Sequence, residues 1–443
     1  FEIAFKWTSF TGGENGLQNV NRPLFTSAFS FHLFSLVVIL GVLWVLWRIA
    51  HAPFGRLMQA LRDNEQRVAS LGFDAYLTKL VGVVIAGGAI GVAGGLMALL
   101  LQGAYANALS WQRAGDPVLM AALGGVHHFL GPLWGAIVFI VLEDRLSAIT
   151  ENWWLIFAPI IIAFALLSAE GIQGVFQRVI GRDRWTLTRW GIPERPANIT
   201  PYVPASTGAN VDLSKPILSV RNLSKSFGSI VTQSGISLDI AHTGLHSLIG
   251  PNGAGKTTFF NLLTGVHKPD AGEMEFEGRS IARLAPHQRA RLGISRSFQI
   301  LSVFPNLTAF ENVRVAVQAA ERNWFSLWRD AYADDATNMR VWSLLDAVGL
   351  AGRAAELCSA LSHGEKRLLE IAVSLATDAR LLLLDDPLAG LAESGREVVG
   401  NLIRRLAATH SVFLIEHDID RVLALSDRIT VLHQGRLIAD GKP

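Results

Sequence analysis

Apolar residues form long runs in the first 180 positions of the chain and are spaced as in a globular protein afterwards. The runs 29–47 and 79–101 are long enough to cross the hydrocarbon core of a bilayer, which takes about 20 helical residues. A third run, 153–168, is shorter, and a fourth, 118–142, is interrupted by glycine and proline. The pattern predicts a membrane-embedded helical segment followed by a water-soluble segment.

Basic residues indicate the side of the membrane on which each connection lies, because arginine and lysine concentrate on the cytoplasmic side. The connection between the first two runs is rich in arginine, and so are residues 178–195. Residues 102–117 and 143–152 contain one arginine each, which is typical of the outer side. For both basic connections to be cytoplasmic, residues 118–142 must enter and leave the membrane on the same side.

The interrupted run therefore predicts a re-entrant element or a pair of short helices. Gly124–Gly125 and Gly131–Pro132 divide it into two apolar pieces. Broken helices at membrane depth are buried in protein or line a cavity. His127 and His128 lie at the break, and ionisable residues at that depth are functional candidates. The alternative is that they hydrogen-bond to the broken backbone or face water.

A phosphate-binding motif lies in the second segment. Residues 250–257 read Gly-Pro-Asn-Gly-Ala-Gly-Lys-Thr, after a predicted strand at 245–249 and at the start of a predicted helix. Glycines at this spacing let backbone N–H groups turn toward phosphates, and the helix N-terminus favours negative charge. Lys256 is expected to contact the β- and γ-phosphates of ATP and Thr257 to reach Mg²⁺. The residues predicted to bind nucleotide here are Gly250, Asn252, Gly253, Ala254, Gly255, Lys256, Thr257 and Thr258.

The connection 52–78 is predicted to be an amphipathic helix. Its apolar residues fall on one face: Phe54, Leu57, Met58 and Leu61. Such a helix can lie on the lipid surface, or it can dock on the nucleotide-binding segment and transmit its motion. We favour docking because both segments belong to one polypeptide.

Composition limits the function classes. The formal net charge of +2 gives no indication of a nucleic-acid partner. The single cysteine, Cys358, forms no intrachain disulfide, as is typical of a reducing compartment. Residues 181–216 carry five prolines and no periodicity, which predicts a partly disordered linker between domains 1–180 and 217–443. Because the chain begins with Phe1 rather than Met, we expect it to be part of a longer protein.

Further motifs follow in the order found in ABC transporter ATPases. Residues 361–365, Leu-Ser-His-Gly-Glu, resemble the ABC signature, and Asp385 ends an apolar strand that resembles Walker B. Gln299 matches the Q-loop glutamine and His417 the switch histidine. Phe227 matches the aromatic residue that stacks on adenine, although a core aromatic is the alternative.

The chain as a whole resembles ABC importers for branched-chain amino acids. The marks are Arg296–Gln299 and Ala389–Leu391 in the second segment, and Pro53–Arg56 and Gly131–Ala136 in the first. The resemblance implies a multi-domain fold: an α-helical transmembrane permease domain followed by an α/β P-loop ABC ATPase domain with an antiparallel β subdomain. It further implies a multi-pass protein of the bacterial inner membrane with a cytoplasmic ATPase, moving branched-chain amino acids or related small polar solutes.

The resemblance also implies site roles and partners. Asp386 and His417 would be catalytic, while Thr257, Gln299 and Asp385 would hold Mg²⁺. The signature residues Ser362, His363, Gly364 and Glu365 would act on ATP bound to a second ATPase subunit. A second permease subunit, an extracytoplasmic solute-binding protein and membrane lipid would complete the partners.

Two residues depart from the family pattern. Asp386 stands where relatives usually have glutamate, and its side chain is one methylene shorter. A misplacement of about 1 Å can cost roughly 100-fold in rate. One alternative to an importer is therefore a nucleotide-gated subunit with a weak ATPase site. The other alternative is an exporter, a transporter of opposite direction. His127–His128 replaces a small residue and threonine, which could alter the path or the cargo.

Overall fold

The computed structural model describes residues 6–7, 13, 16–20, 25, 27–105, 108, 110–126, 128–152, 154–167, 171–180, 192–204, 214–321 and 325–443. The chain divides into two compact units. One comprises Phe1–His51 and Val81–Gly191, and the other Ala52–Leu80 and Ile192–Pro443. His127 and residues 181–191 and 205–213 of the predicted linker lie outside the described residues.

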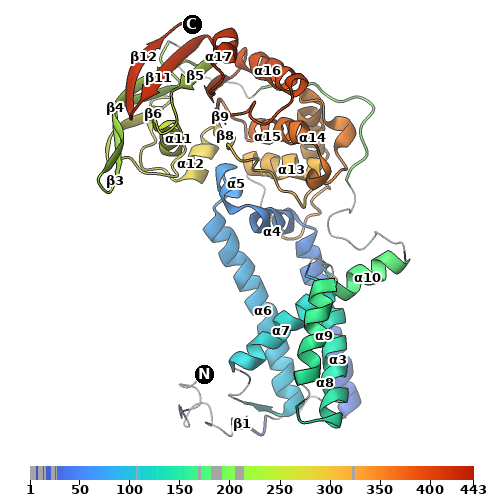
Figure 1. Cartoon of the computed structure of the whole chain (residues 1–443). Helices are drawn as coiled ribbons and strands as arrows, with labels where there is room; N and C mark the ends of the chain where they lie inside the picture. Colours follow the sequence, from blue (N-terminus) through green and yellow to red (C-terminus); the bar gives the residue numbers. More distant parts are fainter. Residues whose placement is uncertain are drawn as a thin grey trace. The chain divides into compact units, whose positions relative to one another are not determined.

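The first unit is helical (Figure 1). Its elements are α3 (Ala28–Ala50), most of α6 (Ala75–Leu101), α7 (Trp111–Gly124), α8 (Gly131–Ile149), α9 (Trp154–Leu167), α10 (Gly171–Ile180) and the paired strands β1 (Leu17–Gln18) and β2 (Gly103–Ala104). Among the described residues, α3 and α6 are long and apolar enough to cross a membrane. Their side chains are largely exposed, as expected for lipid-facing helices.

The predicted interruption between residues 124 and 131 is confirmed, because α7 ends at Gly124 and α8 begins at Gly131. The two helices pack closely: a Cβ on Gly124 would lie 1.8 Å from the carbonyl oxygen of Gly131. The predicted extent of this element was too short. Helix α8 continues to Ile149, through residues expected to form a connection, because no glycine or proline stops it before Thr150.

The second unit contains two sheets. A six-stranded sheet has the order β12-β11-β5-β10-β9-β8, with neighbours parallel except at β12. Its strands are β5 (Gly244–Ile249), β8 (Ile294–Arg296), β9 (Leu381–Asp385), β10 (Ser411–Ile415), β11 (Arg428–His433) and β12 (Arg436–Gly441). Strand β9 is buried throughout, as the uninterrupted leucines of a central parallel strand require.

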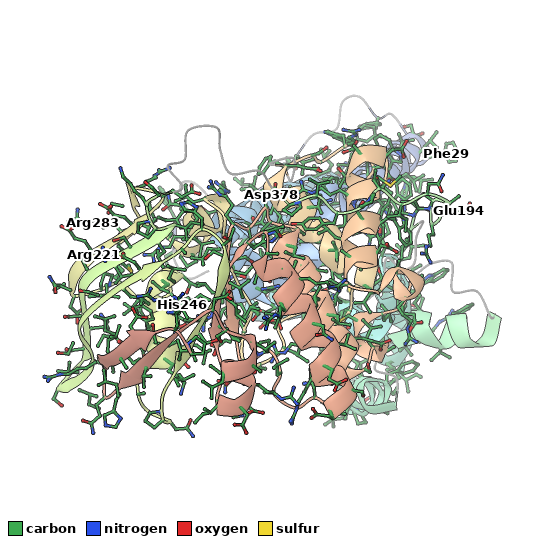
Figure 2. The ribbon with its side chains drawn as sticks, turned by 90° about the horizontal axis from the view of Figure 1, so that it is seen from above. Phe29, Glu194, Arg221, His246, Arg283 and Asp378 are labelled. Carbon is green, nitrogen blue, oxygen red and sulfur yellow. The ribbon has the colours of Figure 1, made fainter. Side chains whose placement is uncertain are left out.

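An antiparallel sheet of order β4-β3-β6-β7 lies in the same unit. Its strands are β3 (Leu218–Phe227), β4 (Ile230–Ile240), β6 (Ala271–Phe276) and β7 (Arg279–Ser280). Arg221 lies on the inner strand β3, and its exposed guanidinium pairs with Asp239 of the neighbouring strand β4 (Figure 2). This sheet fulfils the expected antiparallel subdomain, and its inner face packs with Phe259 and Phe260 in one apolar core.

Helices complete the second unit, and most of them contribute residues to a second apolar core. They are α4 (Pro53–Asp63), α5 (Glu65–Ser70), α11 (Lys256–Leu263), α12 (Pro286–Arg291), α13 (Ala309–Ala320), α14 (Asp335–Ala347), α15 (His363–Leu375), α16 (Glu393–Ala407) and α17 (Ile419–Leu425). Three residues of the predicted linker, Ile192, Ile199 and Tyr202, also pack against this core. The domain boundaries given above stay a prediction.

The segment 52–78 is two helices rather than one. Asn64 separates α4 from α5, and its side chain accepts a hydrogen bond from the Arg67 N–H at 2.9 Å, which caps α5. Leu57 and Leu61 are buried in the same core as Phe310 of α13. The apolar face predicted from the sequence is therefore covered by protein, as expected for docking.

Candidate nucleotide-binding site

The P-loop connects β5 to α11. Gly253 and Gly255 have φ angles of +81° and +101°, a conformation that residues with a Cβ rarely adopt. Space is also restricted at Gly255, where a Cβ would lie 2.7 Å from the carbonyl oxygen of Thr232. The loop thus needs glycine for its backbone and for its neighbours.

Lys256 is the first residue of α11 and folds over this loop. Its Nζ donates hydrogen bonds to the carbonyl oxygens of Gly250 at 2.5 Å and of Pro251 at 3.1 Å. The ammonium group therefore lies beside the loop amides and the helix N-terminus. All three favour an anion at the same place.

A cavity of about 590 Å³ opens beside the P-loop. Predicted site residues that line it are Asn252, Gly253, Ala254, Gly255, Lys256, Thr257, Thr258, Gln299, Asp385, Asp386 and His417. The oxygen donors of Thr257, Gln299 and Asp385 suit a hard cation such as Mg²⁺. Residues from four separate parts of the sequence (252–258, 299, 385–386 and 417) therefore line one cavity.

The signature residues and Phe227 do not line this cavity. Ser362 caps α15, and its backbone N–H donates to the Glu365 carboxylate at 2.8 Å. Phe227 is 43% exposed and contacts the rings of His267 and the ammonium group of Lys225. A ring this exposed is not part of the core, and its stacking on adenine stays a prediction.

Asp385 is buried at the end of β9 and paired with Arg296. The distance from Arg296 Nη2 to Asp385 Oδ2 is 3.0 Å, and both side chains are almost fully buried. Burial raises the pKa of Asp385, and the neighbouring guanidinium opposes that rise. The Ser297 hydroxyl accepts the backbone N–H of Asp385 at 3.2 Å.

Asp386 contacts two other predicted site residues. Its carboxylate accepts a hydrogen bond from Gln299 Nε2 at 3.4 Å and lies 3.1 Å from His417 Nδ1. The hydrogen bond with Asp386 raises the pKa of His417. Asp386 has a φ angle of +47°, which aspartate tolerates better than most residues.

Glu416 is a neighbour that the motifs did not single out. Its carboxylate accepts the backbone N–H groups of Leu388 at 3.2 Å and His417 at 3.1 Å. Ligand atoms of Asp386, Glu416 and His417 lie within 4.8 Å of one another. Burial raises the pKa of Glu416. An acidic residue at the end of an apolar strand, directly before His417, was the available signal.

Arg367 and Glu370 form a second buried ion pair, on α15. Arg367 Nη1 lies 2.6 Å from Glu370 Oε2, and Nη2 donates to the carbonyl oxygens of Gln299 at 3.1 Å and Asp386 at 3.0 Å. Glu370 Oε1 accepts the Phe298 N–H at 3.0 Å. The pair therefore holds the backbone at Gln299 and Asp386 in place.

Two family models match the chain. One, described as ABC transporter, matches residues 233–389, and one described as branched-chain amino acid transport system / permease component matches residues 1–166.

Individual relatives match the second unit. LivG of Salmonella typhimurium, a high-affinity branched-chain amino acid transport ATP-binding protein, is 38% identical over 240 residues, which cover 52% of this chain and 93% of LivG. BraF of Pseudomonas aeruginosa, which carries the same description, is 37% identical over the same shares. A solved ATP-binding cassette of an ABC transporter, in its ADP conformation, is 26% identical with a TM-score of 0.45, over 51% of this chain and 91% of that one.

Proposed function

This chain belongs to the ABC transporter family, in which it joins a permease segment of the branched-chain amino acid type to an ATP-hydrolysing segment, and we propose that it imports branched-chain amino acids or related small polar solutes. The chain is a membrane-associated component of an ABC importer. We further propose that it crosses the bacterial inner membrane several times and carries its ATPase in the cytoplasm. The permease match favours import over the exporter alternative.

The observation that supports this function best is the docking of segment 52–80 on the ATPase. In a transporter, nucleotide binding must reach the membrane segment through a physical contact. Segment 52–80 provides that contact, because α4 and α5 contribute buried residues to the core of the ATPase and the segment continues into α6, an apolar helix long enough to span a membrane.

The cavity residues divide the work on ATP. Lys256 and the loop amides bind the phosphates, and Phe227, which lies outside the cavity lining, stacks on the adenine. Thr257, Gln299 and Asp385 hold Mg²⁺, which supplies positive charge to the phosphates when bound. Asp386 accepts a proton from the attacking water, and His417 orients the water and the γ-phosphate.

Partners complete the site. The signature residues 362–365 lie outside this cavity, and we propose that they contact ATP held by a second ATPase subunit. A second permease subunit and an extracytoplasmic solute-binding protein complete the importer, with lipid around α3 and α6.

The test is the variant Lys256→Ala in the assembled transporter, reconstituted in ATP-loaded proteoliposomes. We expect loss of ATP-dependent uptake of labelled leucine while the subunits still co-purify. Lys268→Ala, an exposed lysine outside the cavity, is the matched control. Unchanged uptake in Lys256→Ala would exclude the mechanism.

A second candidate function is a nucleotide-gated subunit with negligible turnover, which the short side chain of Asp386 favours. The two differ in hydrolysis by the natural protein. Brisk hydrolysis that depends on Asp386, in the transporter with its partner ATPase inactivated, would exclude the gated subunit.

A further inference from the structure

Arg67, on the docked helix α5, is fully buried in the ATPase (0% exposed). Its Nη1 donates to the carbonyl oxygen of Arg296 at 2.6 Å. Its Nη2 donates at 3.3 Å to both the carbonyl oxygen of Glu370 and the hydroxyl of Ser374. Burial lowers the pKa of this guanidinium. Removing a charge from water is unfavourable, and here only neutral oxygens receive its hydrogen bonds.

The acceptors belong to two elements that are far apart in the sequence. Arg296 ends β8, and Glu370 and Ser374 belong to α15. A single side chain from the permease connection therefore contacts a strand of the sheet and a helix of the helical core at once. A shift of either element relative to the other must stretch or break one of these bonds.

Both elements lead directly to the nucleotide cavity. The side chain of Arg296 pairs with Asp385, and the backbone continues through Phe298 to Gln299. The side chain of Glu370 accepts the Phe298 N–H and pairs with Arg367, which holds the carbonyls of Gln299 and Asp386. Arg67 is thus one hydrogen bond away from each buried ion pair of the site.

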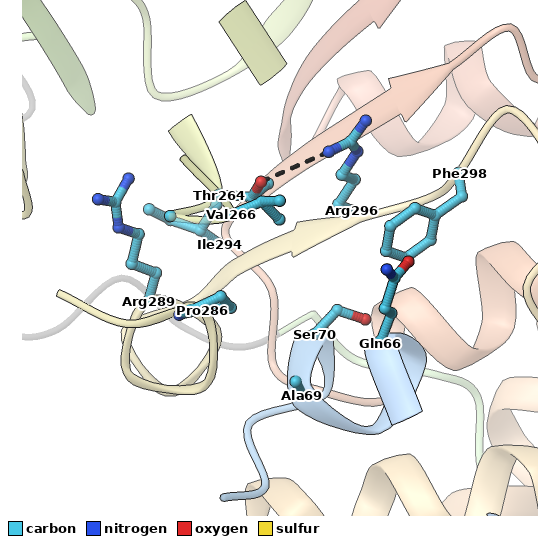
Figure 3. A pocket seen from close by; sticks show the side chains of 11 residues that line it. Gln66, Ala69, Ser70, Thr264, Val266, Pro286, Arg289, Ile294, Arg296 and Phe298 are labelled. Atoms are coloured by element: carbon cyan, nitrogen blue, oxygen red, sulfur yellow. Dashed lines mark hydrogen bonds between the residues drawn. The ribbon is translucent and has the colours of Figure 1, made fainter. Parts of the chain in front are cut away.

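The other face of α5 is not closely packed. Gln66, Ala69 and Ser70 line a cavity of about 290 Å³, which Ile294 and Phe298 also line (Figure 3). Void-lining atoms lose dispersion contacts, so packing on this face holds α5 only weakly. The hydrogen bonds of Arg67 are the stronger link between α5 and β8.

We propose that Arg67 is a positioning residue that transmits the nucleotide state of the cavity to the permease segment through β8 and α15. This rests on the proposed function. When nucleotide moves the backbone at Gln299 and Asp386, β8 and α15 shift, and the guanidinium that contacts both carries α5 with them. The side chain contacts no nucleotide and takes no part in the chemistry.

The first experiment compares Arg67→Met with Arg62→Met in the assembled transporter. Methionine keeps the apolar stem and removes every donor, while Arg62 lies on α4 with a half-exposed side chain. We expect Arg67→Met to lower leucine uptake per ATP hydrolysed at least fivefold, with KM for ATP within about twofold of wild type. Arg67→Lys keeps the charge but not the planar set of guanidinium N–H donors, and its uptake per ATP hydrolysed should be intermediate. Equal uptake per ATP in Arg67→Met and Arg62→Met would overturn the proposal.

The second experiment does not depend on the cargo or on Arg67→Met assembling well. Hydrogen exchange of residues 65–70 and 296–299 is measured with and without a non-hydrolysable MgATP analogue, in wild type and in Ser374→Ala. We expect the analogue to change exchange in both segments of the wild type, and the change in 65–70 to shrink at least twofold in Ser374→Ala. An undiminished change in 65–70, or none in the wild type, would overturn the proposal. Wild type that shows the change but neither hydrolyses ATP nor transports would instead contradict the proposed function.

Discussion

Arg296 and Asp385 form a buried ion pair, 3.0 Å between Nη2 and Oδ2, at the carboxyl end of the central sheet. Burial raises the pKa of the Asp385 carboxyl, and the guanidinium of Arg296 opposes that rise. The pair also aims Asp385 at the phosphate cavity before any cation is present. The guanidinium is fixed in turn by the Asn261 side chain of the P-loop helix.

Removing Arg296 should therefore destabilise the ATPase. Leaving one partner of a buried pair uncompensated costs about 3–5 kcal/mol. We expect Arg296→Met to lower the midpoint of thermal unfolding of the detergent-solubilised protein by several degrees and to weaken MgATP binding. Arg279→Met, at an exposed arginine on β7, should change neither. Unfolding of Arg296→Met at the wild-type temperature would show that the pair adds no stability.

The length of the Asp386 side chain should limit hydrolysis. Glutamate would reach one methylene further toward the attacking water, and a geometric correction of about 1 Å corresponds to roughly 100-fold in rate. We expect Asp386→Glu to raise kcat for ATP hydrolysis by roughly tenfold or more, and Asp386→Asn to abolish turnover at this site. The assay is steady-state phosphate release from the assembled transporter with its partner ATPase inactivated.

The same variant, Asp386→Glu, should lower the stability of the protein while it raises the rate of hydrolysis. Asp386 has a φ angle of +47°, and longer side chains pay about 1–2 kcal/mol in this region. Asp386→Glu should therefore melt slightly earlier than wild type. An Asp386→Glu variant that hydrolyses no faster than wild type would mean that aspartate already reaches the water.

The docking of α4 depends on a second charged contact, between Arg56 and Glu311. Their side chains are almost fully buried and 3.2 Å apart, and the Tyr332 hydroxyl donates to the same carboxylate at 2.8 Å. We expect Arg56→Met and Glu311→Gln each to lower leucine uptake and the melting temperature. The double variant should lose less than the sum of the two, because no unpaired charge remains. Glutamine can still close the capping box with Thr308, so α13 itself stays intact.

A strictly additive double variant would show that Arg56 and Glu311 act independently. The melting temperature and uptake should be measured on the same preparations. Loss of uptake without any change in melting would place the effect on transmission rather than on folding.

The residues of the nucleotide cavity could be predicted from the sequence because they lie in short contiguous motifs. The P-loop is contiguous, Asp385 ends an apolar strand and Asp386 follows it, and His417 lies two residues after the end of another. Parallel neighbouring strands bring such residues to one edge of a sheet. The docking face of 52–78 could be predicted for a similar reason, because helical periodicity shows which apolar residues lie on one face and must be covered.

The burial of these arginines could not be predicted from the sequence in this way. Arg67 and Arg367 look like surface residues in sequence, and only long-range packing shows that each is enclosed. The break at Asn64 was also missed, since a single asparagine within an amphipathic pattern is a weak stop signal. It becomes a helix cap only when its side chain finds the Arg67 N–H.

Close packing of α7 on α8 should make Gly135 intolerant of any side chain. A Cβ there would lie 1.8 Å from the carbonyl oxygen of Met120, a backbone atom that cannot rotate away. We expect Gly135→Ala to separate the two helices, costing at least about 1–3 kcal/mol, the range typical of overpacking. Gly88→Ala on α6 is the matched control, because no other described part of the chain comes within 4 Å of a Cβ built there. The measurements are melting temperature and monodispersity in detergent. If Gly135→Ala and Gly88→Ala behaved alike, the paired-helix arrangement at residues 124–135 would be wrong.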